Sequence, residues 1–508
     1  MFRGIVLVLA LSFSTGSIGS AGPIPSTRPN VLFLVSDDLN TFLGCYGDPR
    51  AKTPNLDKLA ARGVRFDRAY CTYPLCGPSR NSFLTGLYPN SNGILGNSQT
   101  FRQTIPAHRS LPQLFRLQGY FAAGIGKLFH FEVPKSIGTS GLGDAAAWEL
   151  EIQPAGVDRL EEESRIFSLI PGRLGDTLSW HASSRADSEH TDAISAENAS
   201  WVLERCAKRK DRSFFLAVGF FRPHTPFVAP QVYFDKYPLA EMPVLRQSPG
   251  ERIDLPAAAL VSRKPEDGKM TDDQRRQCVR AYYASISFMD AQVGQVIDSL
   301  DRLGLASNTV LVFTSDHGYH MGEHGLWMKQ SLFEECARVP LLIVAPGVSA
   351  KGGVATSPVS LVDLYPTLCD LCRVPAPTGL QGQSLVPLLR DPKVMGRGWA
   401  LTQIVRAGRP KSGVAGNPQE RSSRYFGYSL RTPRWRYTEW DEGRHGRELY
   451  DHDADPRELT NRADNPEIVS HVDELSRQLR AAVKSTIPAT GRTPEVQPLL
   501  WSPTLTGM

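Results

Sequence analysis

The feature of this sequence that most restricts its fold is a regular alternation of short apolar runs and longer amphipathic segments. The first run, residues 30–35, is rich in β-branched and apolar side chains and ends at Ser36-Asp37-Asp38, which is typical of a buried strand with acidic groups at its carboxyl end. Further strand-like runs lie at residues 120–125, 214–219, 309–314 and 340–345. Helical patterns lie at residues 54–62, 110–118, 196–207, 282–303 and 361–371. The alternation predicts an α/β sandwich, with a large mixed or parallel sheet between helices.

Ionisable residues follow several of these strand-like runs. In chain order they are Asp37 and Asp38, Lys127 and His130, His224, and Asp316 and His317. In α/β sheets of this kind, ligands bind at the carboxyl ends of the strands. We therefore expect these side chains to meet along one edge of the sheet and to form a functional site there.

The pattern changes near residue 400. Short strand-like runs at 428–431, 435–437 and 448–450 stand between turn residues, and a helical pattern follows at 467–483. We expect a main domain of residues 28–400 and a smaller C-terminal domain, residues 401–508, with an antiparallel sheet and a packing helix. Residues 406–424, rich in Gly, Pro, Ser and Arg, are predicted to form a loop that rims the site.

The amino terminus has the pattern of a secretory signal peptide. Met1-Phe2-Arg3 precedes an apolar run and then small residues up to Ala21, so residues 1–21 are predicted to be the signal. The apolar run is too short to cross a bilayer of roughly 30 Å, and no membrane span is expected elsewhere. The protein is expected to be secreted or periplasmic, or lysosomal if its source is a eukaryote. The single sequon, Asn198-Ala199-Ser200, favours a bacterial source.

Composition argues against two other classes of protein. The eight cysteines among 508 residues are too sparse for a fold held together by disulfides. The formal charge of +5, from 57 basic and 52 acidic residues, is small and not gathered into a block, so nucleic-acid binding is not expected.

The most specific motif is Cys76-Gly77-Pro78-Ser79-Arg80, followed by Leu84-Thr85-Gly86. Taken alone, Cys76 would more often be an ordinary cysteine before a helix. The whole run, however, resembles the maturation motif of the sulfatase family, Cys-x-Pro-Ser-Arg followed by Leu-Thr-Gly. Within that family the chain most resembles the iduronate-2-sulfatases, through runs at residues 35–39, 43–48, 214–220, 222–224, 282–287 and 322–325.

The resemblance implies an alkaline-phosphatase-like fold and hydrolysis of a sulfate ester. It implies that a separate maturation enzyme oxidises Cys76 to formylglycine, whose hydrate offers one hydroxyl to attack sulfur and a second to expel sulfate. The residue types agree with this reading. Pro78 and Ser79 suit the start of a helix, with Ser79 as cap or first-turn residue, so residue 76 would lie at the positive end of a helix dipole, where an anion is stabilised.

A divalent ion would lower the pKa of the attacking hydroxyl. Asp37, Asp38, Asp316 and His317 are the candidates to hold it, although an isolated Asp-Asp pair is more often a turn or a helix cap. Three carboxylates favour a hard cation such as calcium. The resemblance implies one Ca²⁺ ion bound by these four residues and the modified Cys76, with His317 standing where many relatives have Asn.

The remaining candidates handle charge and protons. Arg80, Lys127 and Lys329 are expected to neutralise the sulfate; Arg80 lies one helical turn beyond Cys76 and could reach back to it. By resemblance, His130 assists collapse of the sulfated diol and His224 protonates the leaving oxygen, roles that suit histidine. Each lysine could instead be a surface residue and each histidine a structural one. His320 and His324, close to Asp316 in sequence, are secondary candidates.

The substrate implied by the resemblance is a sulfated glycan, with a 2-O-sulfated uronate of heparan or dermatan sulfate as the nearest example. Two other functions stay open. One is a phosphoesterase or phosphonate hydrolase of the same fold, which usually carries Ser or Thr as nucleophile. The other is a non-catalytic glycan-binding relative in which Cys76 is never oxidised.

Overall fold

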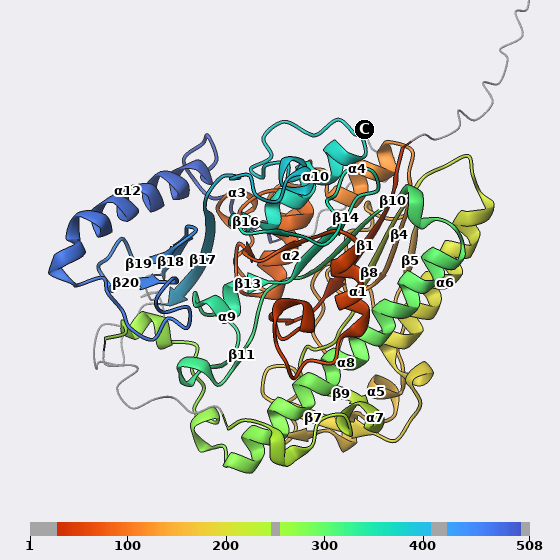
Figure 1. Ribbon diagram of the computed structural model, residues 1–508, viewed down its shortest axis with the longest axis horizontal. Coiled ribbons are helices and arrows are strands. Elements are labelled where there is room, and N and C mark those ends of the chain that lie inside the picture. Colours follow the sequence, from red (N-terminus) through yellow and green to blue (C-terminus); the bar gives the residue numbers. More distant parts are fainter. Residues whose placement is uncertain (1–27, 245–253, 408–423, 499–508) are drawn as a thin grey trace, which may run out of the picture.

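The computed structural model describes residues 28–244, 254–407 and 424–498 (Figure 1). The predicted signal peptide, residues 1–21, lies outside these ranges. Within them, no helix combines the length and the apolar character needed to cross a membrane. All eight cysteines lie in the described ranges, and none of them forms a disulfide.

An eight-stranded sheet forms the centre of the molecule, in the order β15-β2-β14-β10-β1-β8-β4-β5. Its four inner strands are mutually parallel; in sheet order they are β10 (Thr309–Ser315), β1 (Asn30–Ser36), β8 (Phe214–Gly219) and β4 (Phe121–Gly126). β14 runs antiparallel to β10, and β2 runs antiparallel to β14. The outer strands are β14 (Leu341–Val344), β2 (Val64–Phe66), β15 (Gly353–Ala355) and β5 (Leu150–Ile152). The sheet is therefore mixed, as the sequence predicts.

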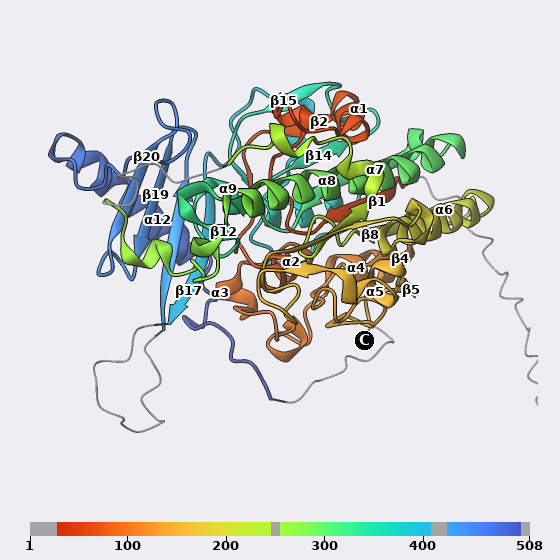
Figure 2. The same ribbon diagram turned by 90° about the horizontal axis from the view of Figure 1, so that it is seen from below.

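A layer of helices covers each face of this sheet (Figures 1 and 2). Alternate side chains of a strand point to opposite faces. On one face, Leu32 and Leu34 of β1 share a core with α1 (Pro54–Arg62), α6 (Thr191–Lys208) and α8 (Asp272–Arg302). On the other, Val31 and Phe33 share a core with α2 (Cys76–Thr85), α4 (Leu111–Leu117) and α10 (Leu364–Leu371). The predicted α/β sandwich is confirmed.

Two helices begin earlier than the sequence patterns predict. α8 starts at Asp272 rather than near residue 282, and α6 starts at Thr191 rather than near residue 196. The first turn of α8 is polar: Thr271 Oγ1 accepts from Gln274 N at 3.2 Å, and the Gln274 side chain accepts from Thr271 N at 2.9 Å. This capping box stabilises the helix start without any apolar side chain, so a search for apolar periodicity misses it.

Three small sheets surround the main one. The pair β11 (His320–Met321) and β12 (Trp327–Met328) forms a hairpin near the carboxyl end of β10. The others are β13 (Arg338–Val339), β3 (Ala69–Tyr70) and β16 (Val359–Ser360), and β6 (Phe167–Ser168), β7 (Ser179–Ser183) and β9 (Phe227–Pro230).

A four-stranded antiparallel sheet forms the C-terminal part, at the left of Figure 1. Its strands are β17 (Ala400–Ala407), β18 (Arg424–Arg431), β19 (Trp435–Trp440) and β20 (Arg447–Asp451), and α12 (Val469–Ser485) packs on them through Leu475 and Leu479. The predicted loop at 406–424 is wrong at both ends, because Arg406 lies in β17 and Arg424 in β18. Pairing between β17 and β18 continues through the polar residues Arg406 and Arg424 at these strand ends. Residues 408–423 lie outside the described ranges.

Candidate active site

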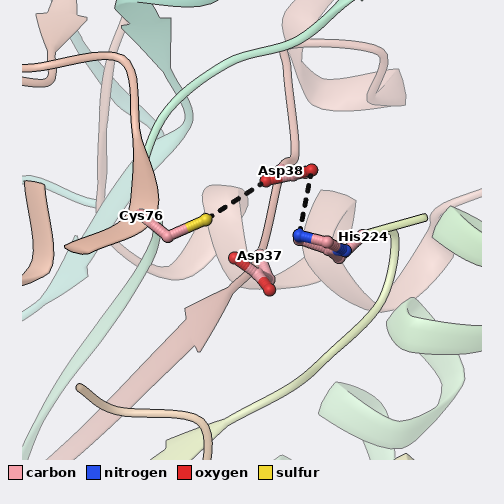
Figure 3. Close-up of side chains that lie close together, drawn as sticks. All are labelled: Asp37, Asp38, Cys76 and His224. Carbon is pink, nitrogen blue, oxygen red and sulfur yellow. Dashed lines mark hydrogen bonds and ion pairs between the residues drawn. The ribbon is translucent and has the colours of Figure 1, made fainter. Parts of the chain in front are cut away.

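The carboxyl ends of the four parallel strands bring the expected side chains together in a buried group. In chain order these residues are Asp37 and Asp38 after β1, Lys127 and His130 after β4, His224 after β8, and Asp316 and His317 after β10. α2 adds Cys76 and Arg80, and Lys329 enters from the segment after β12. Four of these side chains, from three separate segments of the chain, are drawn in Figure 3.

Cys76 is the first residue of α2 and is fully buried. Its Sγ lies 3.0 Å from Lys329 Nζ, 3.3 Å from His317 Nε2 and 3.7 Å from Asp38 Oδ1. Burial alone would raise the pKa of this thiol, but Lys127 and Lys329 outweigh it and lower the pKa. Ser79 lies in the first turn and caps nothing, since its Oγ donates to the main-chain oxygen of Asp316 at 2.5 Å.

Arg80 contacts carboxylates rather than Cys76. Its Nε donates to Asp316 Oδ2 at 2.8 Å, and its Nη2 donates to Asp37 Oδ1 at 3.2 Å. Its Nη1 donates to the main-chain oxygen of Lys127 at 2.5 Å. Among the described residues, no hydrogen bond joins Arg80 to Cys76 Sγ. The guanidinium therefore links the ends of β1, β4 and β10.

Two glycines let the main chain bring Lys127 to this group. Gly126 has a φ of +68°, which favours glycine. A Cβ atom on Gly219 would lie 1.9 Å from the main-chain oxygen of Lys127, so no larger residue fits there. Lys127 Nζ then lies 2.5 Å from Asp37 Oδ2. Burial would raise the pKa of Asp37, but Lys127, together with Arg80 and Lys329, holds it well below its usual value.

Asp38 is the carboxylate that faces Cys76. Its φ is +62°, a left-handed conformation that Asp tolerates, and Tyr282 Oη donates to its main-chain oxygen at 2.8 Å. Oδ1 lies 2.6 Å from Lys329 Nζ and 3.2 Å from His317 Nε2. Burial raises the pKa of Asp38 to about 7 even though Lys329 opposes the rise.

The three histidines differ in protonation. Burial and Lys329 hold the pKa of His224 well below its usual value, and burial and Lys127 lower that of His130 to about 3. Both rings are therefore neutral. His224 Nδ1 lies 2.5 Å from the main-chain oxygen of Thr225, which assigns the proton to Nδ1. Burial opposes the charge of His317, but Asp316 and Cys76 raise its pKa to about 10.

The group has the donor atoms of a metal site. Asp37, Asp38, Cys76 and His224 place one donor atom each within 4.8 Å of one another, and Cys76 does the same with Asp316 and His317. Asp38 Oδ2 is buried, accepts no hydrogen bond within the described ranges, and lies 3.7 Å from His224 Nε2 (Figure 3). Carboxylate oxygens of this kind suit a hard divalent cation, so the residues present fit Ca²⁺.

The secondary candidates lie elsewhere. His320 Nε2 is 2.6 Å from Ser331 Oγ, and the ring of His324 stacks on Phe333 with centroids 4.0 Å apart. Neither histidine belongs to the groups of donor atoms around Cys76.

The sequence did not predict the residues that hold the main chain next to the site residues in place. Asp192, in the first turn of α6, accepts from the main-chain nitrogens of Phe221 at 2.8 Å and Arg222 at 2.9 Å, and so fixes the segment that carries His224. Asn97 Oδ1 accepts from Gly77 N at 2.8 Å. An acidic residue in a first helical turn was the available signal for Asp192; Asn97 had none.

A cavity of about 980 Å³ opens onto the group and is lined by His130, His224 and Lys329. Among the described residues, six Lys or Arg side chains line it and only two acidic ones, Glu132 and Asp176. The basic residues are Lys135, Arg173, Arg263, Lys264, Lys329 and Arg406. The wall of this cavity is therefore suited to an anionic ligand.

Comparison with known proteins agrees with this geometry. The family model described as Sulfatase matches residues 29–374. A sulfatase of Formosa agariphila is 31% identical, over 92% of this chain and 87% of that protein. Iduronate 2-sulfatase of Homo sapiens is 31% identical, over 89% of this chain and 95% of that protein.

A solved structure with a similar fold is the phosphonate monoester hydrolase of Agrobacterium radiobacter. Its TM-score is 0.74 at 24% identity, and the likeness covers 90% of this chain and 96% of that one. This likeness shows the fold alone, which is alkaline-phosphatase-like, as the sequence predicts. The family model and the two relatives show the family as well as the fold: the chain belongs to the sulfatase family of sulfuric ester hydrolases.

Proposed function

We propose that this protein hydrolyses sulfate esters of an anionic glycan, using a formylglycine made from Cys76 by a maturation enzyme. The observation that carries the proposal is the position of Cys76. Its Sγ, which stands where the reactive oxygen of the oxidised side chain would be, lies at the start of α2 within 3.7 Å of Lys329, His317 and Asp38. A hydrated aldehyde there would supply one hydroxyl to attack sulfur and a second hydroxyl whose deprotonation re-forms the aldehyde and expels sulfate. A sulfate ester of serine has no second hydroxyl for this step.

The cations of the site would hold the sulfate. Lys329 Nζ is nearest to Cys76 Sγ, and Lys127 Nζ is held beside it by Asp37. Their charges oppose the negative charge that develops on the sulfate oxygens in the transition state. Arg80 would hold Asp37 and Asp316 in position through its ion pairs with them. Its effect on the substrate would therefore be indirect.

The neutral histidines suit proton transfer in different ways. Burial and Lys127 lower the pKa of His130 to about 3, so its ring is neutral, and its Nδ1 has no hydrogen-bond partner among the described residues. A bound sulfate would raise this pKa by its negative charge and so allow the ring to accept a proton. His224 must carry a proton on Nε2 to act as the acid for the leaving oxygen. A bound sulfate ester would raise the pKa of His224, because it brings negative charge beside the ring.

We propose Ca²⁺ as the cofactor, held by Asp37, Asp38, Asp316 and His317 together with the oxidised residue 76. The pKa of His317 is about 10 without the ion, so this ring would have to lose its proton on binding it. When bound, it would lower the pKa of the attacking hydroxyl and oppose charge on the sulfate. Asp38, whose ionised form burial disfavours, would be kept ionised by the charge of the bound cation.

The proposed substrate is a sulfated glycan, supported by the charge of the cavity wall and by the relative that is named an iduronate 2-sulfatase. We further propose a catalytic domain of residues 28–400, a C-terminal domain of residues 401–508, and export through a signal peptide at residues 1–21. Export would place the enzyme where polysaccharides are found.

Peptide mass analysis tests the proposal directly. Trypsin would release residues 69–80, which contain Cys71 as an internal control for Cys76. In protein produced together with a maturation enzyme, we expect an alkylating reagent to label one cysteine of this peptide and a hydrazide to label the other position. Two alkylated cysteines, and no turnover of an aryl sulfate, would contradict the proposal.

The fold likeness to a phosphonate monoester hydrolase favours one rival function. Turnover of matched aryl sulfate, aryl phosphate and phosphonate esters separates the two. We expect the sulfate ester to have the largest kcat/KM. A preference for phosphorus would favour the rival, and binding of glycans without turnover by protein with an oxidised residue 76 would favour a non-catalytic role.

A further inference from the structure

Arg406, in β17, is a buried cation on the wall of the cavity. Its side chain is held by main-chain oxygens: Nε donates to Ala258 at 3.2 Å, and Nη2 donates to Gln330 at 2.8 Å. The guanidinium also lies over the ring of Trp440, 5.3 Å from its centroid. Three separate segments therefore fix its position.

Arg406 differs from every other buried arginine of the described ranges. Five of the six buried arginines form an ion pair with a carboxylate within 4.0 Å, and Arg406 does not. The paired ones are Arg80, Arg102, Arg222, Arg431 and Arg436. A buried charge without a partner destabilises the fold, so this arrangement calls for an explanation.

Among the residues that the structure describes, the neighbouring groups do not supply the missing charge. Glu448 is near enough to affect Arg406, but its carboxylate accepts from Trp440 Nε1 at 2.6 Å and from Tyr450 Oη at 2.8 Å. Burial lowers the pKa of Arg406 to about 10, so the side chain stays charged near neutral pH. Arg406 lines the cavity, where an anion could meet its charge.

We infer that Arg406 binds a second anionic group of the substrate, a carboxylate or another sulfate, beside the sulfate that is cleaved. The inference rests on the proposed function. Gln330, which receives the Arg406 hydrogen bond, adjoins Lys329, whose Nζ is 3.0 Å from Cys76 Sγ. Arg406 Nη1 forms no hydrogen bond with a described residue, so Nη1, with the second hydrogen of Nη2, can donate to an oxyanion. The protein would thus select sugars that carry two negative groups.

Two pairs of substrates test the inference and show whether the second anionic group is a carboxylate or a sulfate. The first pair is a 2-O-sulfated uronide and its carboxyl-reduced analogue; the second is a disulfated hexoside and the monosulfated one. We expect wild-type enzyme to prefer the more anionic member of one pair in kcat/KM. In Arg406→Gln this preference should fall by about tenfold or more, because a hydrogen bond to a charged group is lost. Arg406→Lys should retain part of it.

Arg173→Gln is the matched control, since Arg173 lines the same cavity but is exposed and paired with Asp176. We expect it to change both members of a pair alike. Thermal melts establish that each variant folds, and calorimetry with the Cys76→Ala protein measures binding of the same compounds without turnover. Equal preference in wild type, or a preference unaltered in folded Arg406→Gln, would overturn the inference. Lack of all sulfate hydrolysis with residue 76 oxidised would instead contradict the proposed function.

Discussion

At the scale of single residues, the site concentrates charge where water is excluded. Asp37, Asp38 and Asp316 are fully buried, as are Arg80 and Lys127. Each carboxylate has a cation within 3.2 Å, because an unpaired buried charge is costly. Cys76, the proposed precursor of the nucleophile, lies among them.

Cys76→Ala is expected to abolish turnover while sparing the fold. The variant loses the precursor of the nucleophile, which should reduce kcat by a factor on the order of 10⁴ or more, but Ala is a good helix former at the start of α2. Kinetics with an aryl sulfate and a thermal melt check this. Cys71→Ala, at a buried cysteine five positions earlier, should retain turnover. Activity in the Cys76 variant would rule out the proposed nucleophile.

Removal of the metal is expected to lower both turnover and stability. Without a dication, Asp38 is poorly tolerated in its ionised form, as its pKa of about 7 indicates. Calcium that binds only the folded state would raise the melting temperature. Scanning calorimetry with a chelator and then with added calcium measures this. In Asp37→Asn, added calcium should raise the melting temperature by less than in wild type. A wild-type melting temperature that neither the chelator nor calcium changes would argue against a calcium site.

The sequence could predict which residues enter this site, because chemical type and position after a strand are local properties. It could not predict their contacts. Arg80 was expected near Cys76 but pairs with Asp37 and Asp316, since distant strands bring those carboxylates closer. Arg406 was assigned to a loop, because its place in β17 depends on pairing with β18 and its contacts with Ala258 and Gln330 depend on the fold.

At the scale of elements, β17 connects the C-terminal sheet to the segment that leads into α2. Gln403 N donates to the main-chain oxygen of Thr72 at 2.9 Å, and Thr402 Oγ1 donates to that of Cys71 at 2.7 Å. The segment around Lys329 is also constrained, with left-handed main chain at Met328 and Gln330, each with a φ of +70°. Such conformations persist where surrounding contacts enforce them, and here they direct Lys329 inward.

A buried ion-pair cluster joins β19 to α9 (Glu334–Ala337), outside the C-terminal sheet, and should make stability depend on pH. Arg436 pairs with Glu334, in α9, and with Glu458 at 2.5 Å. Burial would raise the pKa of Glu458, but Arg436 and His452 lower it to about 2. A lowered pKa stabilises the folded state fully above the unfolded value near 4.5, and the contribution is lost as pH falls toward 2.

We therefore expect the melting temperature of wild type to fall steeply below pH 4.5, where Glu458 starts to lose this contribution. Glu458→Gln should be less stable at neutral pH and should lose less on acidification. Glu467→Gln, at an exposed glutamate, serves as the control and should follow wild type. Parallel curves for wild type and the Glu458 variant would show that the cluster does not govern the acid transition.

At the scale of the whole molecule, the alternation of strands and helices was sufficient to predict the central sandwich. Its register and the mixed directions of β14 and β2 were not predictable, because strand pairing depends on contacts between distant segments. The C-terminal sheet was predicted from its short strands, but β17 was not. Its apolar residues Leu401 and Ile404 are buried in different clusters, so they do not produce one simple pattern.

The excess of cations on the cavity wall predicts a dependence on ionic strength. Raising sodium chloride from about 0.02 to 0.5 M should lower kcat/KM for a polyanionic glycan several-fold, because screening weakens attraction beyond the Debye length. The effect on a small aryl sulfate should be weaker. Lys135→Gln, at a side chain 84% exposed, should flatten the dependence. Rates for the glycan that do not change with salt would indicate that the wall charges do not guide the substrate.

The burial of Cys76 has a consequence for the order of events in the life of this protein. Every residue of α2 is buried, and the exposed fraction of Cys76 is 0%. An enzyme that modifies this side chain cannot reach it once the helix has packed against the sheet. Modification would have to precede folding, while the chain is still extended during synthesis or export. A cell that folded the protein faster than it modified it would accumulate a stable, correctly shaped and permanently inactive product.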